Sequence, residues 1–235
     1  MPTMKEIYDF HSIEYDELVT KEDYQNNLKN YLLNNFDFKN KSIIELGAGT
    51  GRLTKIYAKD SKNISIYDRS SHMMDKAKLN LKEFSESIKF GICDNLNINE
   101  IKEKADIILE GWSFGHTAID KFETITDTIK ELIDNCKSML NSGGTIIIIE
   151  TLGTNYNKPT ETSPALSKLF SILENSYNFK RYVLRTDYKF DSEEDAKRVT
   201  SYFFGEKFAK NLKNAKNGIV KEYTGVWSFS TNHDQ

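Results

Sequence analysis

The chain has 235 residues, of which 38% are hydrophobic and 12% aromatic, and its 32 basic and 35 acidic side chains give a net charge of −3. The 14 Phe and 12 Tyr exclude an intrinsically disordered chain, because disordered segments lack the aromatic residues that build a core. The near balance of charge disfavours a dedicated nucleic-acid or membrane-surface protein.

The sequence carries few signals of where the protein is located in the cell. The longest purely aliphatic run, Ile146–Ile149, is far shorter than the roughly 20 residues that cross a bilayer. The first residues carry no apolar stretch behind a basic one, so we expect no secretory signal. The only cysteines, Cys93 and Cys136, have neither metal-ligand nor redox spacing, which indicates a reducing compartment. We therefore expect a cytoplasmic α/β protein without a metal site.

The first half of the chain alternates between helices and short aliphatic strands. Two helices are predicted first, and the strands that follow are separated by helices or loops. The predicted helices cover residues 5–19, 21–34, 52–59, 71–86 and 120–140, and the predicted strands cover 42–46, 63–67, 88–92, 105–109 and 145–149. Strands that are aliphatic at consecutive positions suit a sheet buried on both faces, and the alternation predicts parallel pairing with right-handed crossovers. The turn signal at 141–144 is expected to end the last of these helices.

The second half follows a different pattern. Ser163 is a good N-cap and Pro164 suits the first helical position, so a helix is predicted to start there. A strand over 180–190, a helix opening at 191–194 and running past Phe204 and Gly205 to about 214, and a strand over 219–230 complete the chain. We predict one open, mostly parallel seven-stranded sheet with helices on both faces and an antiparallel last strand, the last two strands being placed to pair.

The most informative segment joins the first predicted strand to the helix after it. Gly47, Gly49 and Gly51 alternate there, and glycine permits backbone conformations and close approaches that a Cβ would block. The carboxyl ends of parallel strands are where open α/β sheets bind ligands, and the following helix offers free N–H groups. About nineteen residues after Gly49, Asp68 ends the second strand, where its carboxylate can accept hydrogen bonds from ribose hydroxyls. Glu45, on the first strand, is placed to meet an ammonium group.

Two familiar nucleotide loops do not match this turn. A dinucleotide-binding loop needs a small residue where Arg52 stands, and the third glycine comes one position early, at Gly51. A P-loop needs Gly-Lys-Ser/Thr where this chain has Gly51-Arg52-Leu53. The loop therefore suits a nucleoside with an amino-acid carboxylate better than two phosphates.

The segment Glu45–Gly51 resembles the signature loop of class I S-adenosylmethionine-dependent methyltransferases, most like those that act on small molecules, and the likeness runs through residues 42–150. The resemblance implies a Rossmann-like sheet and S-adenosyl-L-methionine as cofactor. It implies one domain over 1–235, with a helical cap at 1–36, a cofactor-binding core at 42–150 and a substrate side at 151–235. Asp68 is then expected to hold the ribose, Met73 to lie on the adenine and Asp94 to reach the adenine amino group. The cofactor-binding residues that it implies are Tyr15, Tyr24, Glu45, Gly47, Ala48, Gly49, Asp68, Arg69, Met73, Asp94, Asn95, Leu96, Glu110, Gly111 and Trp112.

Methyl transfer from a sulfonium is an in-line displacement, which mainly requires alignment and exclusion of water. Aromatic faces stabilise the sulfonium cation, and Trp112, Tyr15 and Tyr24 are the candidates. A base is required only when the acceptor carries a proton of high pKa. His116, just after the fourth predicted strand, is the first candidate for this base, with capping of the next helix as the structural alternative. His11 is the second candidate.

Three other functions stay open from the sequence. A methyltransferase of RNA or protein has the same fold, but the Asn/Asp-Pro-Pro-Tyr/Phe motif of amino-group modifiers is absent where Glu110–Ser113 stands. A nicotinamide-dependent oxidoreductase is disfavoured by Arg52, and a non-catalytic nucleoside-binding module is not excluded. The lysines at 207, 210, 213 and 216 are typical of a solvated helix face. We expect a small-molecule partner, neither membrane nor nucleic acid, and a monomer or homodimer.

Aromatic residues between positions 203 and 229, here called the late aromatic candidates, could form the wall of an acceptor pocket, although such residues more often belong to the core. They are Phe203, Phe204, Tyr223, Trp227 and Phe229.

Overall fold

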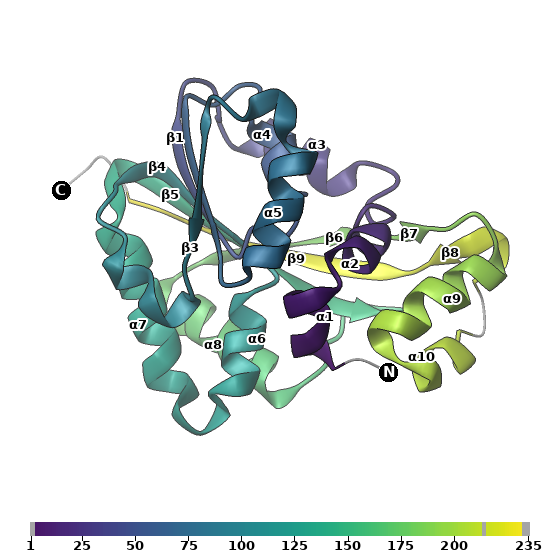
Figure 1. Cartoon of the computed structure of the whole chain (residues 1–235). Coiled ribbons are helices and arrows are strands. Elements are labelled where there is room, and N and C mark those ends of the chain that lie inside the picture. The colour runs from purple at the N-terminus through teal and green to yellow at the C-terminus, as the bar shows by residue number, and fades with distance from the viewer. Residues whose placement is uncertain (1–2, 213–214, 232–235) are drawn as a thin grey trace.

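A computed structural model describes residues 3–212 and 215–231 (Figure 1). Its main sheet has seven strands in the order β3-β2-β1-β4-β5-β9-β6. The strands are β1 (Ser42–Leu46), β2 (Asn63–Asp68), β3 (Ile88–Ile92), β4 (Ala105–Gly111), β5 (Leu140–Thr154), β6 (Lys180–Arg185) and β9 (Glu222–Ser230). The strands β1 to β5 pair in parallel, whereas β9 is antiparallel to both β5 and β6. The predicted fold class, including the pairing of the last two strands of the sheet, is confirmed.

Helices surround the sheet, and a small sheet of β7 (Tyr188–Lys189) and β8 (Ile219–Val220) lies apart from it. The α-helices are α1 (Met4–Phe10), α2 (Ser12–Val19), α3 (Asn27–Asn35), α4 (Thr54–Tyr57), α5 (Ser71–Asn80), α6 (Phe114–Asp120), α7 (Ile125–Ser138), α8 (Pro164–Tyr177), α9 (Glu193–Phe204) and α10 (Glu206–Lys210). Short 3₁₀ helices are η1 (Lys82–Phe84), η2 (Asn95–Glu100), η3 (Phe122–Thr124) and η4 (Lys216–Gly218). No helix in these described ranges is long and apolar enough to span a membrane.

The isoleucine run of β5 explains why the sheet is covered on both sides. Ile146 and Ile148 belong to one hydrophobic core, together with residues of α6, α7 and α8. Ile147 and Ile149 belong to the other, together with residues of α3, α4 and α5. All four side chains are fully buried, because alternate residues of a strand point to opposite faces.

The N-terminal helices lie across the carboxyl end of the sheet. The helix α1 packs on α5 and α2, and α2 packs on both α5 and α9. In Figure 1 the two helices lie between α5 and the pair α9 and α10. They therefore bridge the first and last thirds of the chain above the site where open α/β sheets bind ligands.

The observed N-terminal helices are shorter than the sequence predicts. The helix predicted over 5–19 is interrupted at His11, whose φ of −128° and ψ of 46° are not helical. The helix predicted over 21–34 begins only at Asn27, because Asp23 and Asn26 have positive φ values. The Asp23 carboxylate accepts hydrogen bonds from the backbone N–H groups of Leu28 and Lys29, which are unsatisfied at the start of a helix. Apolar spacing therefore overestimated both helices.

The region before β5 also differs from the prediction. The helix predicted over 120–140 is preceded by α6 and covers only 125–138, and the turn predicted at 141–144 lies inside β5. This segment is a bulge, because Leu140 pairs with Ala105 while Thr145 pairs with Ile107. The Asn141 side chain donates to Asp106 Oδ1 at 2.9 Å and holds the bulge against β4. The glycines thus interrupt the register and do not end a helix.

Other predicted elements are divided or shortened. The predicted strand 180–190 is split into β6 and β7, and the predicted strand 219–230 is split into β8 and β9. The helices predicted over 52–59 and 71–86 are reduced to α4 and α5. After α9, Gly205 has a φ of +91° and redirects the chain into α10, which ends at Lys210. The predicted end of that helix, at 213–214, lies outside the described residues.

Candidate active site

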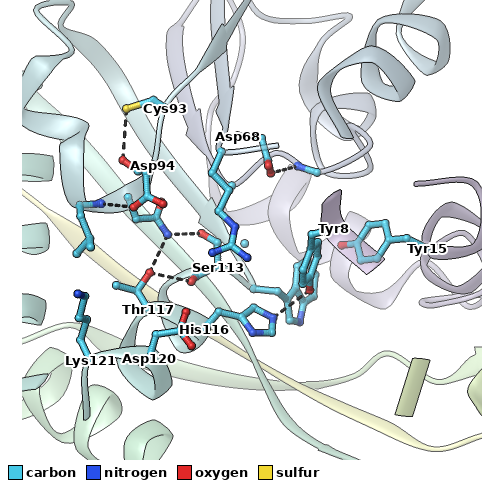
Figure 2. A pocket seen from close by; sticks show the side chains of 17 residues that line it. Tyr8, Tyr15, Asp68, Cys93, Asp94, Ser113, His116, Thr117, Asp120 and Lys121 are labelled. Atoms are coloured by element: carbon cyan, nitrogen blue, oxygen red, sulfur yellow. Dashed lines mark hydrogen bonds between the residues drawn. The ribbon is translucent and has the colours of Figure 1, made fainter. Parts of the chain in front are cut away.

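A hollow of about 750 Å³, here called the first hollow, opens at the carboxyl ends of β1, β2 and β4 (Figure 2). It is lined by Tyr8, Tyr15, Gly47, Gly49, Asp68, Arg69, Cys93, Asp94, Asn95, Leu96, Gly111, Trp112, Ser113, His116, Thr117, Asp120 and Lys121. The structure therefore brings together most of the residues that the resemblance implied for cofactor binding.

The glycine turn forms the floor of the first hollow. Gly47, Gly49 and Gly51 have φ values of +66°, +54° and +84°, in the region that residues with a Cβ rarely adopt. A Cβ on Gly47 would lie 2.2 Å from Ser113 Oγ, and one on Gly49 would lie 3.5 Å from the Tyr15 ring. The turn is thus tightly enclosed at Gly47 and close to an aromatic side chain at Gly49.

Asp68 joins this turn to the start of α5. Its Oδ2 accepts a hydrogen bond from Gly49 N at 2.9 Å, and its Oδ1 accepts one from Ser70 N at 2.8 Å. Burial raises the pKa of the carboxyl, while these two backbone bonds oppose that shift. A carboxylate has about four lone-pair sites, so acceptor capacity is left for ligand hydroxyls.

The loop after β3 forms another wall. Asp94 caps η2 by accepting a hydrogen bond from Leu96 N at 2.9 Å. The Asn95 side chain donates to Ser113 Oγ at 3.2 Å and to Thr117 Oγ1 at 3.1 Å, as the dashed lines in Figure 2 show. These bonds fix the loop against the start of α6. Ser113 and Thr117 were not predicted, and no sequence pattern marked them.

Trp112 follows β4 with a φ of +55°, which is unusual for a bulky residue. Its backbone N–H donates to Ile149 O at 2.8 Å, so the strained residue is held by the sheet. The Arg52 guanidinium lies 3.9 Å from the centre of the Trp112 ring, and Arg52 Nη1 donates to Glu22 Oε2 at 2.5 Å. Arg52, which excluded a dinucleotide loop, thus orients the tryptophan.

His116 and Tyr8 form a partly buried pair, with 3.0 Å between His116 Nε2 and the Tyr8 hydroxyl. Burial is the main cause that lowers the pKa of His116, and the Arg69 charge adds to it, so the imidazole is neutral at pH 7. Tyr8 was missed by the sequence analysis. Its separation of seven residues from Tyr15 is a helical spacing that was available as a signal, and the two ring centres lie 5.4 Å apart.

A second hollow of about 780 Å³ adjoins the first. Its lining residues are Tyr8, Tyr15, Leu18, Val19, Glu22, Arg52, Trp112, Gly115, His116, Ile119, Glu150, Thr151, Thr154, Leu166, Tyr188, Phe203, Phe204 and Glu222. Tyr8, Tyr15, Trp112 and His116 line both hollows, so the two spaces meet at these side chains. Of the late aromatic candidates, Phe203 and Phe204 line the second hollow.

The other late aromatic candidates belong to the core. Trp227 is fully buried and stacks on Phe170 with ring centres 4.3 Å apart. Tyr223 and Phe229 pack against the same core.

Glu45 and Glu110, two of the predicted cofactor-binding residues, accept hydrogen bonds from neighbouring groups of the protein. Glu45 Oε2 accepts hydrogen bonds from Thr54 Oγ1, at 2.6 Å, and from the Tyr57 hydroxyl, and burial raises the pKa of Glu45 to about 7. Glu110 Oε1 accepts bonds from the backbone N–H groups of Ser113 and Phe114, at 2.6 and 2.9 Å, and burial raises its pKa to about 7. Neither is among the residues that line the two hollows, and their direct contact with the cofactor stays a prediction.

Four further candidates also lie outside both hollows. Met73 is fully buried and Ala48 is part of the hydrophobic core on the face of α3 to α5, so packing explains both. Tyr24 is 41% exposed in the turn before α3. His11 lies against the Tyr202 ring, with 5.7 Å between ring centres, and does not reach the second hollow. Its expected role as a base stays a prediction.

This sheet order and the site at the strand ends are those of class I methyltransferases. The sequence model of the methyltransferase small domain family matches residues 26–185. The chain belongs to this family, and its methyl donor is S-adenosylmethionine, as the resemblance implied.

The proteins that are similar to this chain have names that refer to different methyl acceptors. The chain is 28% identical to a malonyl-[acyl-carrier protein] O-methyltransferase of Priestia megaterium over 57% of this chain and 47% of that protein. It is 21% identical to a ubiquinone biosynthesis O-methyltransferase of Coxiella burnetii over 65% of this chain and 62% of that protein. The match therefore spans less than two thirds of either relative. The structure of precorrin-6y C5,15-methyltransferase from Geobacter metallireducens has a TM-score of 0.52 and 15% identity, over 85% of this chain and 88% of that one, which shows the fold alone.

Proposed function

We propose that the protein transfers the methyl group of S-adenosylmethionine to a small-molecule acceptor that binds in the second hollow. The observation that carries the proposal is the shared wall of the two hollows, formed by Tyr8, Tyr15, Trp112 and His116. A methyl group presented from the first hollow would meet an acceptor in the second at this wall. The apolar and aromatic lining of the second hollow, which includes Leu166, Phe203 and Phe204, suits an acceptor of low molecular mass.

The residues of the first hollow fit the cofactor. Gly47 lets the Ser113 side chain pack directly against the turn, because a Cβ would lie 2.2 Å from Ser113 Oγ, and we assign this turn to the amino-acid end of the cofactor. Asp68 retains acceptor capacity for the ribose hydroxyls, and Asp94 and Leu96 lie on the wall that we assign to the adenine. When bound, S-adenosylmethionine supplies an electrophilic methyl group on a sulfonium. Tyr15 and Trp112 offer aromatic faces to that cation.

The protein's own contribution is to orient, to exclude water and to accept a proton. Helices α1 and α2 cover the strand ends and place Tyr8 and Tyr15 between the hollows. Neutral His116 accepts the acceptor's proton at Nε2, either directly or through the Tyr8 hydroxyl that lies 3.0 Å away. A proton of high pKa leaves the acceptor nucleophile by this route.

The acceptor class is tested by offering the whole protein labelled S-adenosylmethionine together with separated low-mass, RNA and protein fractions of a cell extract. The proposal predicts label in the low-mass fraction. Asp68→Ala is the matched negative control, because it keeps the second hollow intact and removes a carboxylate of the first. Transfer of label to RNA or protein alone would contradict the proposal and favour the macromolecular alternative.

A further inference from the structure

The end of the second hollow formed by Glu22, Arg52 and Glu222 has two carboxyl groups and one guanidinium. Arg52 pairs with Glu22 at 2.5 Å, and the Glu22 side chain is only 3% exposed. The same guanidinium lies on the Trp112 ring. Its charge is therefore matched first by Glu22. Among the described residues no Lys or Arg forms an ion pair with Glu222, although the charge of Arg52 lowers the pKa of Glu222.

Glu222 is 2% exposed and lines the hollow. Its Oε1 accepts a hydrogen bond from Thr151 Oγ1 at 2.7 Å. Its Oε2 has no partner within hydrogen-bond distance and angle among the described residues, although the nearby Thr154 side chain lowers the pKa of Glu222. A buried oxygen without a partner is unfavourable, and more so when the group is charged, so a hydrogen-bond donor on a bound ligand would stabilise this atom.

The rest of the lining increases the excess of acid. Glu150 is 2% exposed, and its Oε1 accepts a hydrogen bond from Gly115 N at 2.6 Å. Among the described lining residues, Arg52 is the only Lys or Arg side chain, against the carboxyls of Glu22, Glu150 and Glu222. Burial raises the pKa of Glu222 to about 8, and the nearby charge of Glu22 adds to the shift. A ligand carboxylate or phosphate would meet like charge here, whereas a cation would relieve it.

We propose that the acceptor is an amine whose protonated nitrogen binds Glu222 Oε2 in the second hollow; this inference rests on the proposed function. The ammonium supplies a hydrogen-bond donor to Oε2 and a positive charge that favours the ionised form of Glu222 when the ligand is bound. The apolar body of the acceptor packs against the aromatic rings of Phe203, Phe204 and Tyr188, whose faces also favour a cation.

The competing account is a Glu222 that stays protonated and donates to a neutral acceptor. Glu222→Gln distinguishes the two, because glutamine keeps the shape and a donor but cannot supply a negative charge. Glu222→Asp keeps the charge on a shorter side chain. Glu131→Gln, on the exposed face of α7, is the matched control for loss of a carboxylate.

The experiment uses three probes of similar size: 2-phenylethylamine, 2-phenylethanol and 3-phenylpropanoate. Calorimetry first measures binding of S-adenosylhomocysteine, which reports on the proposed function and on folding of each variant. Each probe is then titrated into the protein saturated with that ligand. We expect the amine to bind at least about tenfold more tightly than the alcohol, and the carboxylate not to bind.

In Glu222→Gln the preference for amine over alcohol should disappear, whereas Glu222→Asp and Glu131→Gln should retain it. S-adenosylhomocysteine affinity should be unchanged in all three variants. Absence of amine binding at millimolar concentration, binding of the carboxylate as tight as that of the amine, or a preference that survives Glu222→Gln would overturn the inference. Failure of S-adenosylhomocysteine to bind, with the amine preference intact when the probes are titrated into the unliganded protein, would instead overturn the proposed function.

Discussion

The two hollows meet at one wall but are built in different ways. The first is formed mainly by segments that directly follow β1, β2, β3 and β4, together with the start of α6. The second collects residues from α2, the end of β5, the small β7 and β8 sheet region, α9 and the start of β9. The first is thus a product of local strand-to-loop geometry, whereas the second depends on contacts between distant parts of the chain.

This difference separates what is general in the molecule from what is particular. Loops at the carboxyl ends of parallel strands converge wherever such a sheet forms, so a cofactor site follows from the fold. An acceptor site assembled from the two ends of the chain is free to vary without disturbing the sheet. Substitutions that alter the two hollows separately test this division, beginning with His116, one of the four residues that line both.

His116 lies on the shared wall, and its replacement should have the largest effect. His116→Phe should lower kcat by about 10²- to 10⁴-fold, because the acceptor's proton loses its base. S-adenosylhomocysteine affinity should change little. Initial rates between pH 6 and 9 test this, and Tyr8→Phe, which removes only the hydroxyl partner, should have a smaller effect. Full activity of His116→Phe across that range would contradict the assignment of His116 as the base.

Gly47→Ala should selectively damage the first hollow. The added Cβ would lie 2.2 Å from Ser113 Oγ, at a φ of +66° that alanine disfavours. We expect about a hundredfold loss of S-adenosylhomocysteine affinity, equivalent to about 3 kcal/mol. The double variant Gly47→Ala with Ser113→Gly removes the clash, because the next atom is the backbone Cα at 3.8 Å. Partial recovery in calorimetry supports the geometry, and equal loss in both variants contradicts it.

Asp68→Ala should weaken S-adenosylhomocysteine binding by about 1–3 kcal/mol, because the ribose loses an acceptor and the glycine turn loses its bond to β2. Asp75→Ala, which removes an exposed carboxylate from α5, is the control and should bind normally. Isothermal calorimetry on both variants compares them directly. Equal affinities for the two variants would exclude Asp68 from cofactor binding.

The buried Glu222 of the second hollow should make the stability of the protein depend on pH. Glu222 has a pKa of about 8 when folded, above its ordinary value of 4.5, so the folded state holds a proton that the unfolded state has released. This contribution to the free energy of unfolding is complete at low pH and is lost as the pH rises toward 8.

Glu222→Gln should therefore reduce the fall in Tm between pH 5.5 and 8. We expect a reduction of roughly 2–4 °C for each kcal/mol that Glu222 contributes to the pH-dependent free energy of unfolding. Glu45, Glu110 and Glu150 also have raised pKa values, so some fall should persist. The same slope in Glu222→Gln and in the unmodified protein would show that Glu222 does not carry this effect.

The sequence was informative where function follows from local chain geometry. The alternating glycines and the acidic end of β2 identified Gly47, Gly49 and Asp68, which now line one hollow. Aliphatic runs located β1 and β3 with correct bounds, because strands buried on both faces have few alternative interpretations.

Where the sequence misled, long-range or loop contacts decided the outcome. Glu45 stands beside the glycines but turns to the hydroxyls of Thr54 and Tyr57, which spacing along the strand does not reveal. Glu222 and Arg52 are 170 positions apart in the printed sequence and lie on one hollow only because α2, α9 and β9 meet there. No pattern in the chain predicts such a meeting. Tyr8 was accessible in principle, through its helical spacing to Tyr15.

The central claim is that the first hollow binds S-adenosylmethionine. Calorimetric titration of the unmodified protein with S-adenosylhomocysteine and, in a separate cell, with NADH tests it most directly. We predict saturable one-to-one binding of S-adenosylhomocysteine and no heat of binding with NADH. Binding of NADH without S-adenosylhomocysteine, or of neither ligand, would contradict the claim.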